Sequence, residues 1–226
     1  MQEKQSAILL FSQSAEAEFA QKAFGLSFQK FSKVHNALVN KVRNTARESG
    51  MPVFEATSEI QQGTDFGSRL SHAIHWVSQQ GFDQIIIIGN DSPGLTAAQI
   101  QEADKYLRNG QSVLGKDHHG GAYLIGLDTG KTDLEAFENI QWQTSKVFNQ
   151  LASLLPEVQV LDKVYTDLNG LGDLILVVKG TEVIKSFIAF LRLLVFGAVA
   201  YFRTACLLFK LTTASTHSHR GPPVLA

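Results

Sequence analysis

The chain has 226 residues and a formal net charge of −1, and Cys206 is its single cysteine. This length suits one large domain with a substantial core, and the near-neutral charge gives none of the basic surface that nucleic-acid binding requires. One cysteine excludes an intramolecular disulfide framework and a cysteine-based zinc site. The N-terminal sequence MQEKQSAILLF lacks the pattern of a secretory signal, so we expect a cytoplasmic protein.

The first part of the chain alternates apolar runs with helical periods. Residues 6–13 are apolar and predict a buried first strand, whereas residues 15–49 carry apolar side chains at helical spacing until Gly50 ends the pattern. Residues 51–57 predict a second strand. Residues 61–81 open with glycines and then have one apolar helical face, which predicts a helix.

The alternation continues to about residue 167. Residues 83–90 (DQIIIIGN) are apolar on both faces, which is typical of a central parallel strand, and Thr96 is a suitable N-cap for the next helix. Further strands are predicted at 111–116, 121–128 and 157–167, with short helices around 134–140 and 144–155. This order predicts a three-layer α/β/α domain with a mostly parallel, mixed sheet over residues 1–180.

The stretch IIIIGNDSPGLT (85–96) places Asp91 in a turn directly after the predicted central strand. Ligands of open α/β sheets bind beyond the carboxyl ends of the strands, where a carboxylate can hold a divalent metal that neutralises phosphates. The alternative interpretation is structural, because aspartate and asparagine often bond the backbone of their own turn. The turn alone does not separate these two interpretations.

Four segments occur in a fixed order: QQGTDFGSRL, IIIIGNDSPGLT, SVLGKDHHGGAYLIGL and WQTSKV. In this order and spacing they resemble the MobA-like glycosyltransferases, including the arsenosugar-biosynthesis and selenodomain-associated types. The resemblance is close over residues 61–147 and loose over residues 6–173. It implies the nucleotide-diphospho-sugar transferase (GT-A-like) fold.

The resemblance also implies site residues. Asp91 takes the place of the family's metal- and phosphate-binding aspartate, and Asp167 is the second metal ligand that the resemblance implies. Nucleotide or phosphate contacts are implied for Gly63, Asp65, Arg69, Asp91, Gly120 and Gly121. Asp117, His118 or His119 would lie where an acceptor hydroxyl could lose its proton, and Asp117 and His119 are the predicted catalytic residues. Trp142 matches a later motif, although a large aromatic residue often belongs to the core.

Three departures from the family pattern bear on activity. The basic stretch that usually follows the first strand is replaced by SQSAEAEFAQKAFG (12–25), where Glu16 and Glu18 would repel phosphate and Lys22 is the one candidate replacement. The aspartate before the paired glycines is His119, which can still act as a base or ligand. In the late acidic motif, DLNGLGDL, the middle acid is Asn169.

The resemblance therefore implies transfer from a nucleoside-diphosphate sugar to a small-molecule acceptor, with Mg²⁺ or Mn²⁺ as the cofactor. Two alternatives remain open. One is a catalytically degenerate protein that binds a nucleotide weakly or serves as an interaction module. The other is nucleotidyl transfer to a phosphorylated small molecule, which would normally use the basic stretch that this chain lacks.

Residues 181–226 differ in character from the rest and predict an apolar helical tail. At about 100° per residue, Lys185, Arg192, Arg203 and Lys210 fall on one stripe of an otherwise apolar helix. Such a helix suits peripheral contact with a membrane surface, or packing on the domain or on a second copy through residues 181–210. A spanning helix is disfavoured, because the longest charge-free run, residues 193–202, is far below the ~20 residues that a span needs, and Arg192 would lie inside the span.

Overall fold

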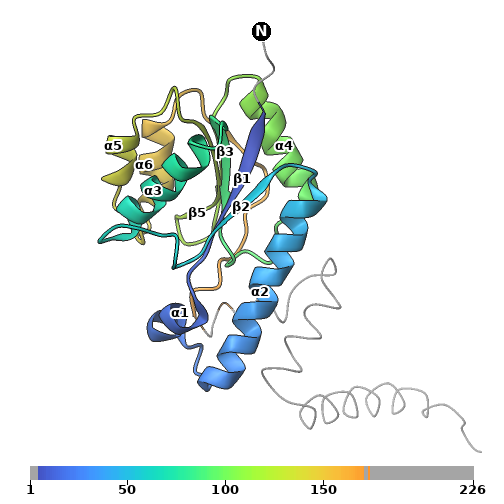
Figure 1. Cartoon of the computed structure of the whole chain (residues 1–226), viewed down its shortest axis with the longest axis vertical. Coiled ribbons are helices and arrows are strands. Elements are labelled where there is room, and N and C mark those ends of the chain that lie inside the picture. Colours follow the sequence, from blue (N-terminus) through green and yellow to red (C-terminus); the bar gives the residue numbers. More distant parts are fainter. Residues whose placement is uncertain (1–4, 171–172, 174–226) are drawn as a thin grey trace, which may run out of the picture.

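The structure is a computed structural model, which describes residues 5–170 and residue 173. These residues form one six-stranded sheet with helices on both faces (Figure 1). The strands are β1 (Ser6–Phe11), β2 (Val53–Ala56), β3 (Gln84–Ile88), β4 (Val113–Lys116), β5 (Ala122–Asp128) and β6 (Gln159–Val160). The helices are α1 (Ala15–Lys22), α2 (Phe28–Glu48), α3 (Phe66–Ser78), α4 (Ala97–Arg108), α5 (Leu134–Glu138) and α6 (Val147–Leu154).

The sheet is mixed, with the strand order β2-β1-β3-β5-β4-β6. β1 pairs in parallel with β2 and β3, β4 pairs in parallel with β6, and β5 runs antiparallel to both β3 and β4. The predicted mixed α/β fold is thereby confirmed. Since β5 reverses direction between β3 and β4, the carboxyl ends of β1, β3 and β4 all lie at the same edge of the sheet.

Alternating residues of β1 and β3 pack into two separate hydrophobic cores, one on each face of the sheet. Leu9 and Ile87 pack on the face covered by α3, α5 and α6, whereas Ile8 and Ile86 pack on the face covered by α2 and α4 (Figure 1). All four isoleucines of β3 are at most 5% exposed. Burying each such side chain contributes about 1.5–3 kcal/mol, so β3 is a rigid base for the turn that follows it.

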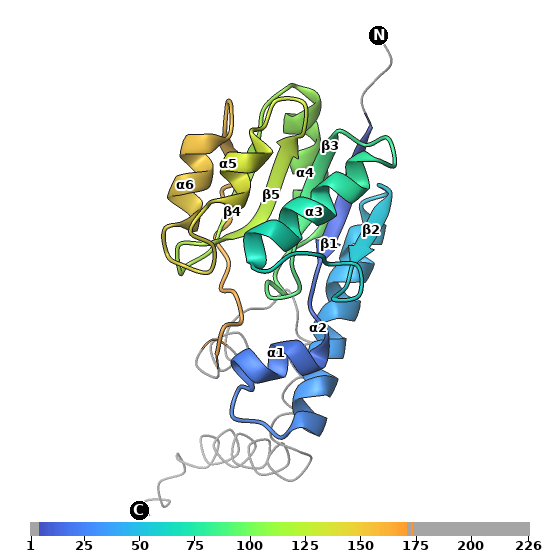
Figure 2. The ribbon, with the colours of Figure 1, turned by 60° about the vertical axis from the view of Figure 1, so that its left-hand side comes forward.

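The predicted helical segment 15–49 is two helices rather than one. Phe24 and Gly25 both adopt positive φ angles, 53° and 67°, and this conformation ends α1 before α2 begins. Phe24 is buried against Phe31, with ring centroids 5.3 Å apart, so the turn is held by aromatic packing. As a result α1 lies beyond the end of the sheet, beside the N-terminal part of α2 (Figure 2).

The predicted strand 157–167 is much shorter than expected. Only Gln159–Val160 pair with β4, and the chain then meets the sheet once more, at a bridge between Tyr165 and Asp117. Val160 and Val164 are each 41% exposed. Because these apolar side chains are not buried against the core, little favours a longer regular strand here. Its irregular path carries Asp167 towards the carboxyl edge of the sheet.

The predicted tail, residues 181–226, lies outside the described residues. Within the described part of the chain, none of the helices combines the length and the apolar character needed to cross a lipid bilayer.

Candidate functional site

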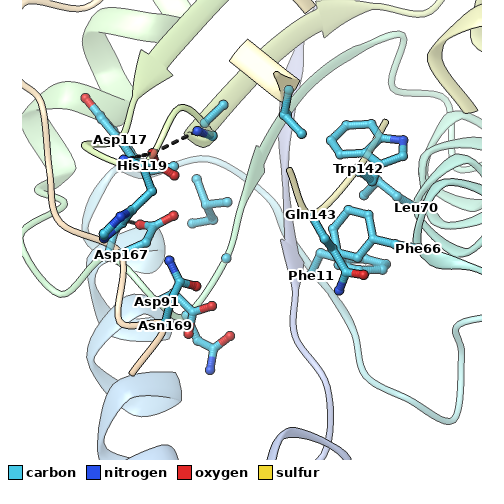
Figure 3. A pocket seen from close by; sticks show the side chains of 18 of the residues that line it. Phe11, Phe66, Leu70, Asp91, Asp117, His119, Trp142, Gln143, Asp167 and Asn169 are labelled. Atoms are coloured by element: carbon cyan, nitrogen blue, oxygen red, sulfur yellow. Dashed lines mark hydrogen bonds between the residues drawn. The ribbon is translucent and has the colours of Figure 1, made fainter. Parts of the chain in front are cut away.

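A cleft of about 430 Å³ opens at the carboxyl edge of the sheet. Its floor is formed by residues that follow β1 and β3, and the β4–β5 turn, the α5–α6 loop and the segment after β6 complete it. One side is acidic, with Asp91, Asp117 and Asp167, and the opposite side carries Phe66 and Trp142 (Figure 3). The volume is within the range of small-molecule sites, and the position is the one at which open α/β sheets bind ligands.

Asp91 lies in the turn after β3, and its side chain is 31% exposed. The Lys22 ammonium at the end of α1 donates to Asp91 Oδ1 across 2.5 Å. Burial raises the pKa of the Asp91 carboxyl above its usual range, while the charge of Lys22 opposes this shift. The turn is tightly packed, because a Cβ at Gly94 would lie 2.5 Å from the Tyr165 ring.

Asp167 reaches the cleft from the irregular segment after β6. It accepts a hydrogen bond from the Ser92 hydroxyl, and the neighbouring Leu168 N–H donates to the Asp91 carbonyl across 3.0 Å. Burial, together with the nearby carboxylates of Asp91 and Asp117, raises the pKa of Asp167 to about 8, although the hydrogen bond from Ser92 acts in the opposite direction. The two predicted metal ligands, Asp91 and Asp167, are distant in sequence but close enough for the charge of one to affect the pKa of the other.

Asp117 follows β4 and is almost completely buried. Its Oδ1 accepts backbone N–H bonds from His119 at 2.6 Å and from Gly121 at 2.8 Å (Figure 3). A Cβ at Gly121 would lie 2.4 Å from Asp117 Oδ2, and one at Gly120 would lie 2.3 Å from the Ser145 carbonyl oxygen. Asp117 and the two glycines thus hold the β4–β5 turn closed against the loop that carries Ser145.

His119 extends from this turn into the cleft lining, and 48% of its side chain is exposed. Its Nε2 lies 3.2 Å from Asp173 Oδ1, and the Asn169 N–H donates to the other oxygen of Asp173 across 3.0 Å. An exposed imidazole oriented by a carboxylate is a common arrangement for a general base. Compared with the buried Asp117, His119 has the more exposed side chain.

Trp142 both packs on the core and lines the cleft. Its indole N–H donates to the Phe137 carbonyl across 3.2 Å, and its ring lies 5.0 Å from that of Phe137 and 5.2 Å from that of Phe66 (Figure 3). Phe66 in turn contacts Phe11 at the end of β1. These rings form a fixed aromatic wall on which a base or a sugar ring could stack.

Phe66 and Leu70 of the first motif line the cleft, but the residues of that motif predicted to bind phosphate do not. Asp65 is the N-cap of α3, where its carboxylate accepts from the Ser68 N–H at 2.8 Å in a capping box. Gly63, Arg69 and Gly120 also do not line the cleft, whereas Asp91, Asp117, His119, Gly121 and Asp167 do. Gly67 makes close helix packing possible, because a Cβ there would lie 2.1 Å from the Glu138 carbonyl oxygen.

Sequence reasoning missed the role of α1. Glu18 was expected to repel phosphate, but it is buried and bonds Asn90 Nδ2 at 2.9 Å and Lys22 Nζ at 3.4 Å. His35 Nε2 lies 3.5 Å from the same carboxylate. Burial acts to raise the pKa of Glu18, but His35 and Lys22 outweigh it and the net shift is downward. The i,i+4 spacing of Glu18 and Lys22 was the available signal.

The carboxylates of the cleft are suitable ligands for a divalent cation. Asp91 and Asp167 offer carboxylate oxygens, which hard cations prefer, and their mutual repulsion is of the kind that a bound cation relieves. Among the described residues, no group of three or more acidic, histidine or cysteine side chains is arranged to hold a metal ion. The residues therefore fit a Mg²⁺-type site, in which one or two carboxylates are completed by water and substrate phosphates.

Comparisons with known proteins give one family match and several similar folds. A family model described as "Uncharacterized protein conserved in bacteria (DUF2064)" matches residues 34–144. A search of curated proteins found no match. The fold is that of a crystal structure described as a "putative nucleotide-diphospho-sugar transferase" from Desulfovibrio desulfuricans G20: the TM-score is 0.73 at 20% identity, over 84% of this chain and 94% of that one.

Rv0371c from Mycobacterium tuberculosis H37Rv is a more distant structural match. It has a TM-score of 0.49 at 12% identity, over 80% of this chain and 100% of that one, and a second structure of it is described as a complex with manganese. The first of these matches supports the predicted nucleotide-diphospho-sugar transferase fold. The arsenosugar and selenodomain subtype stays a prediction, because the matching family is described as uncharacterized.

Proposed function

We propose that this protein is a metal-dependent glycosyltransferase that uses a nucleoside-diphosphate sugar. The observation that carries the proposal is the cleft itself. Carboxylates from three separate segments face a wall of aromatic rings at the carboxyl edge of the sheet. This combination offers a charged side for a metal–diphosphate and a flat apolar side for a ring, which are the two parts of a sugar nucleotide.

Asp91 and Asp167 would hold Mg²⁺ or Mn²⁺, and when bound the cation would neutralise the diphosphate as negative charge develops on it. Asp117 contributes by fixing the β4–β5 turn, since its Oδ1 is already engaged by two backbone N–H groups. Ser92 orients Asp167 from the side of the β3 turn. The protein thus serves to hold the carboxylates of Asp91 and Asp167 in place at the carboxyl edge of the sheet.

His119 would act as the general base for the acceptor. Its position in the lining, and the Asp173 carboxylate 3.2 Å from Nε2, favour an imidazole that takes a proton and is stabilised once charged. The acceptor hydroxyl gives its proton to His119 as its oxygen bonds the anomeric carbon. The bond from that carbon to the diphosphate breaks, and the nucleoside diphosphate leaves with the electron pair.

Purified protein should be titrated with a panel of nucleoside-diphosphate sugars in the presence of Mn²⁺, with the melting temperature as the readout. At a ligand concentration about 100 times the dissociation constant, binding adds about 2.7 kcal/mol of stability, which raises the melting temperature by several degrees. Asp91→Ala should remove the shift. Absence of a shift with every nucleotide, or an unchanged shift in Asp91→Ala, contradicts the proposal.

The number of basic side chains in the cleft helps to rank the two alternatives, nucleotidyl transfer and a catalytically degenerate protein. Lys22 supplies the one lysine or arginine among the described residues that line it, and that ammonium is paired with Asp91. A triphosphate would find little to balance its charge there, which ranks nucleotidyl transfer below sugar transfer. A degenerate protein would give weak nucleotide binding that Mn²⁺ does not strengthen, so repeating the titration without metal separates it from the enzyme.

A further inference from the structure

Lys22 occupies one oxygen of the carboxylate that is proposed to hold the metal. The ammonium lies 2.5 Å from Asp91 Oδ1, and its side chain is only 14% exposed. A divalent cation binds carboxylate oxygens at about 2.0–2.6 Å, so a cation on this oxygen would lie against the Lys22 ammonium. Two cations at such a distance repel each other strongly inside a cleft, where little water screens them.

A second carboxylate is within reach of Lys22. Glu18 Oε2 lies 3.4 Å from the ammonium, one helical turn earlier on α1. Glu18 does not depend on Lys22 for its position, because Asn90 Nδ2 donates to it across 2.9 Å and His35 Nε2 lies 3.5 Å away. Leaving Asp91 would therefore not leave the Lys22 ammonium buried without a partner, which would otherwise be costly.

Lys22 also lies on the side of the cleft from which a diphosphate would approach Asp91. Lys22 is the last residue of α1, which lies beyond the carboxyl edge of the sheet (Figure 2). Its side chain lines the cleft, as do those of Gln21 and Asp91. A diphosphate held by a cation on Asp91 would enter next to this ammonium. An ammonium on a flexible stem is a suitable partner for phosphate oxygens.

We infer that Lys22 is an exchangeable counter-cation: it competes with the divalent metal for Asp91 and, once displaced, binds the diphosphate of the nucleotide. This inference rests on the proposed function, since it needs a metal at Asp91. It goes beyond that function by giving α1 a ligand-binding role and by predicting opposite effects of one substitution on two ligands.

The test compares Lys22→Met with the wild-type chain by isothermal titration, first with Mn²⁺ alone and then with pyrophosphate at saturating Mn²⁺. Removing the competing ammonium should tighten Mn²⁺ binding by about tenfold and weaken pyrophosphate binding by about tenfold, the order expected for a hydrogen bond between charged groups. Lys22→Arg should retain pyrophosphate binding. Lys33→Met, at an exposed position on α2, is the matched control and should change neither affinity.

The outcomes separate this inference from the proposed function. If the wild-type chain binds Mn²⁺ and Lys22→Met binds it equally or more weakly, the competition is wrong while the metal site stands. If pyrophosphate binding is unchanged in Lys22→Met, the phosphate role is wrong. If neither protein binds Mn²⁺, the metal site and the inference fall together. Circular dichroism of each variant confirms that the comparison is made between folded proteins.

Discussion

The turn before α3 and the turn after β3 each place an aspartate two residues after a glycine, yet the two carboxylates have different partners. Asp65 accepts the Ser68 N–H of its own helix, and this bond lowers the pKa of Asp65. Asp91 instead meets Lys22, from a segment 69 residues away, and burial raises its pKa. A carboxylate that caps its own helix is already satisfied, whereas one paired with a flexible lysine is available to a ligand.

The largest expected difference between the two turns is in ligand binding. Asp91→Ala should weaken binding of a nucleoside diphosphate with Mn²⁺ by at least about 30-fold, because truncating one partner of a buried charged contact costs about 2 kcal/mol or more. Arg69→Ala, near the other turn, should change it by less than about threefold, since Arg69 does not line the cleft. Isothermal titration of both variants checks this. Equal losses would mean that the α3 turn also binds the ligand.

The next effect concerns packing around the α3 turn. Gly67→Ala would place a methyl group 2.1 Å from the Glu138 carbonyl oxygen and about 2.9 Å from the Trp142 ring. Overpacking of this kind costs about 1–3 kcal/mol. Urea denaturation should report a lower free energy of unfolding. Gly81→Ala is not a matched control because of its positive φ, so Ser71→Ala on the same helix serves instead. A Gly67→Ala protein as stable as wild type would show that α3 can shift away from α5.

Much of this fold could be predicted from local pattern. The four isoleucines of β3 and the Thr96 N-cap of α4 follow from periodicity and capping chemistry alone. The break between α1 and α2 could not, because Phe24 adopts a positive φ only through aromatic packing that depends on the tertiary fold. Asp167 was predicted as a partner of Asp91, but its route to the cleft runs through irregular chain with no periodic signal.

Within the site, sequence spacing could not tell which residues face the cleft. Lys22 is brought to Asp91 only because the α1–α2 hairpin folds back over the sheet edge. Asp65 and Arg69 lie at the N-terminal end of α3, close in sequence to Phe66, but neither of them lines the cleft. Motif spacing therefore identified aspartates that line the cleft at the carboxyl edge of the sheet, but it did not identify Lys22 as the partner of Asp91.

A smaller effect should appear in the pH dependence of stability. The pKa of Asp167 is raised to about 8 in the folded chain, so between about pH 4 and pH 8 the folded state holds a proton that the unfolded state has lost. Without bound metal, stability should therefore fall as the pH rises through this window. Asp167→Asn should flatten the fall and melt higher than wild type near pH 8.5. Parallel slopes for the two proteins would contradict the assignment.

The smallest predicted effect is at the α3 cap. Asp65→Ala should lower the melting temperature by about 2–4 °C through loss of the N-cap, and Asp65→Asn, which retains a capping oxygen, should lower it less. Affinity for Mn²⁺ and pyrophosphate should stay at the wild-type value in both variants. A loss of affinity in Asp65→Asn at an unchanged melting temperature would show that this carboxylate contacts the ligand directly.

The central claim is that Asp91 and Asp167 hold one divalent cation in the cleft. Crystals soaked with Mn²⁺ and pyrophosphate, measured at the manganese absorption edge, test it most directly. The account predicts a single anomalous peak within about 2.0–2.6 Å of a carboxylate oxygen of each aspartate, with pyrophosphate oxygens completing its coordination. A peak on other side chains, or no peak in the cleft at saturating Mn²⁺, would contradict the account.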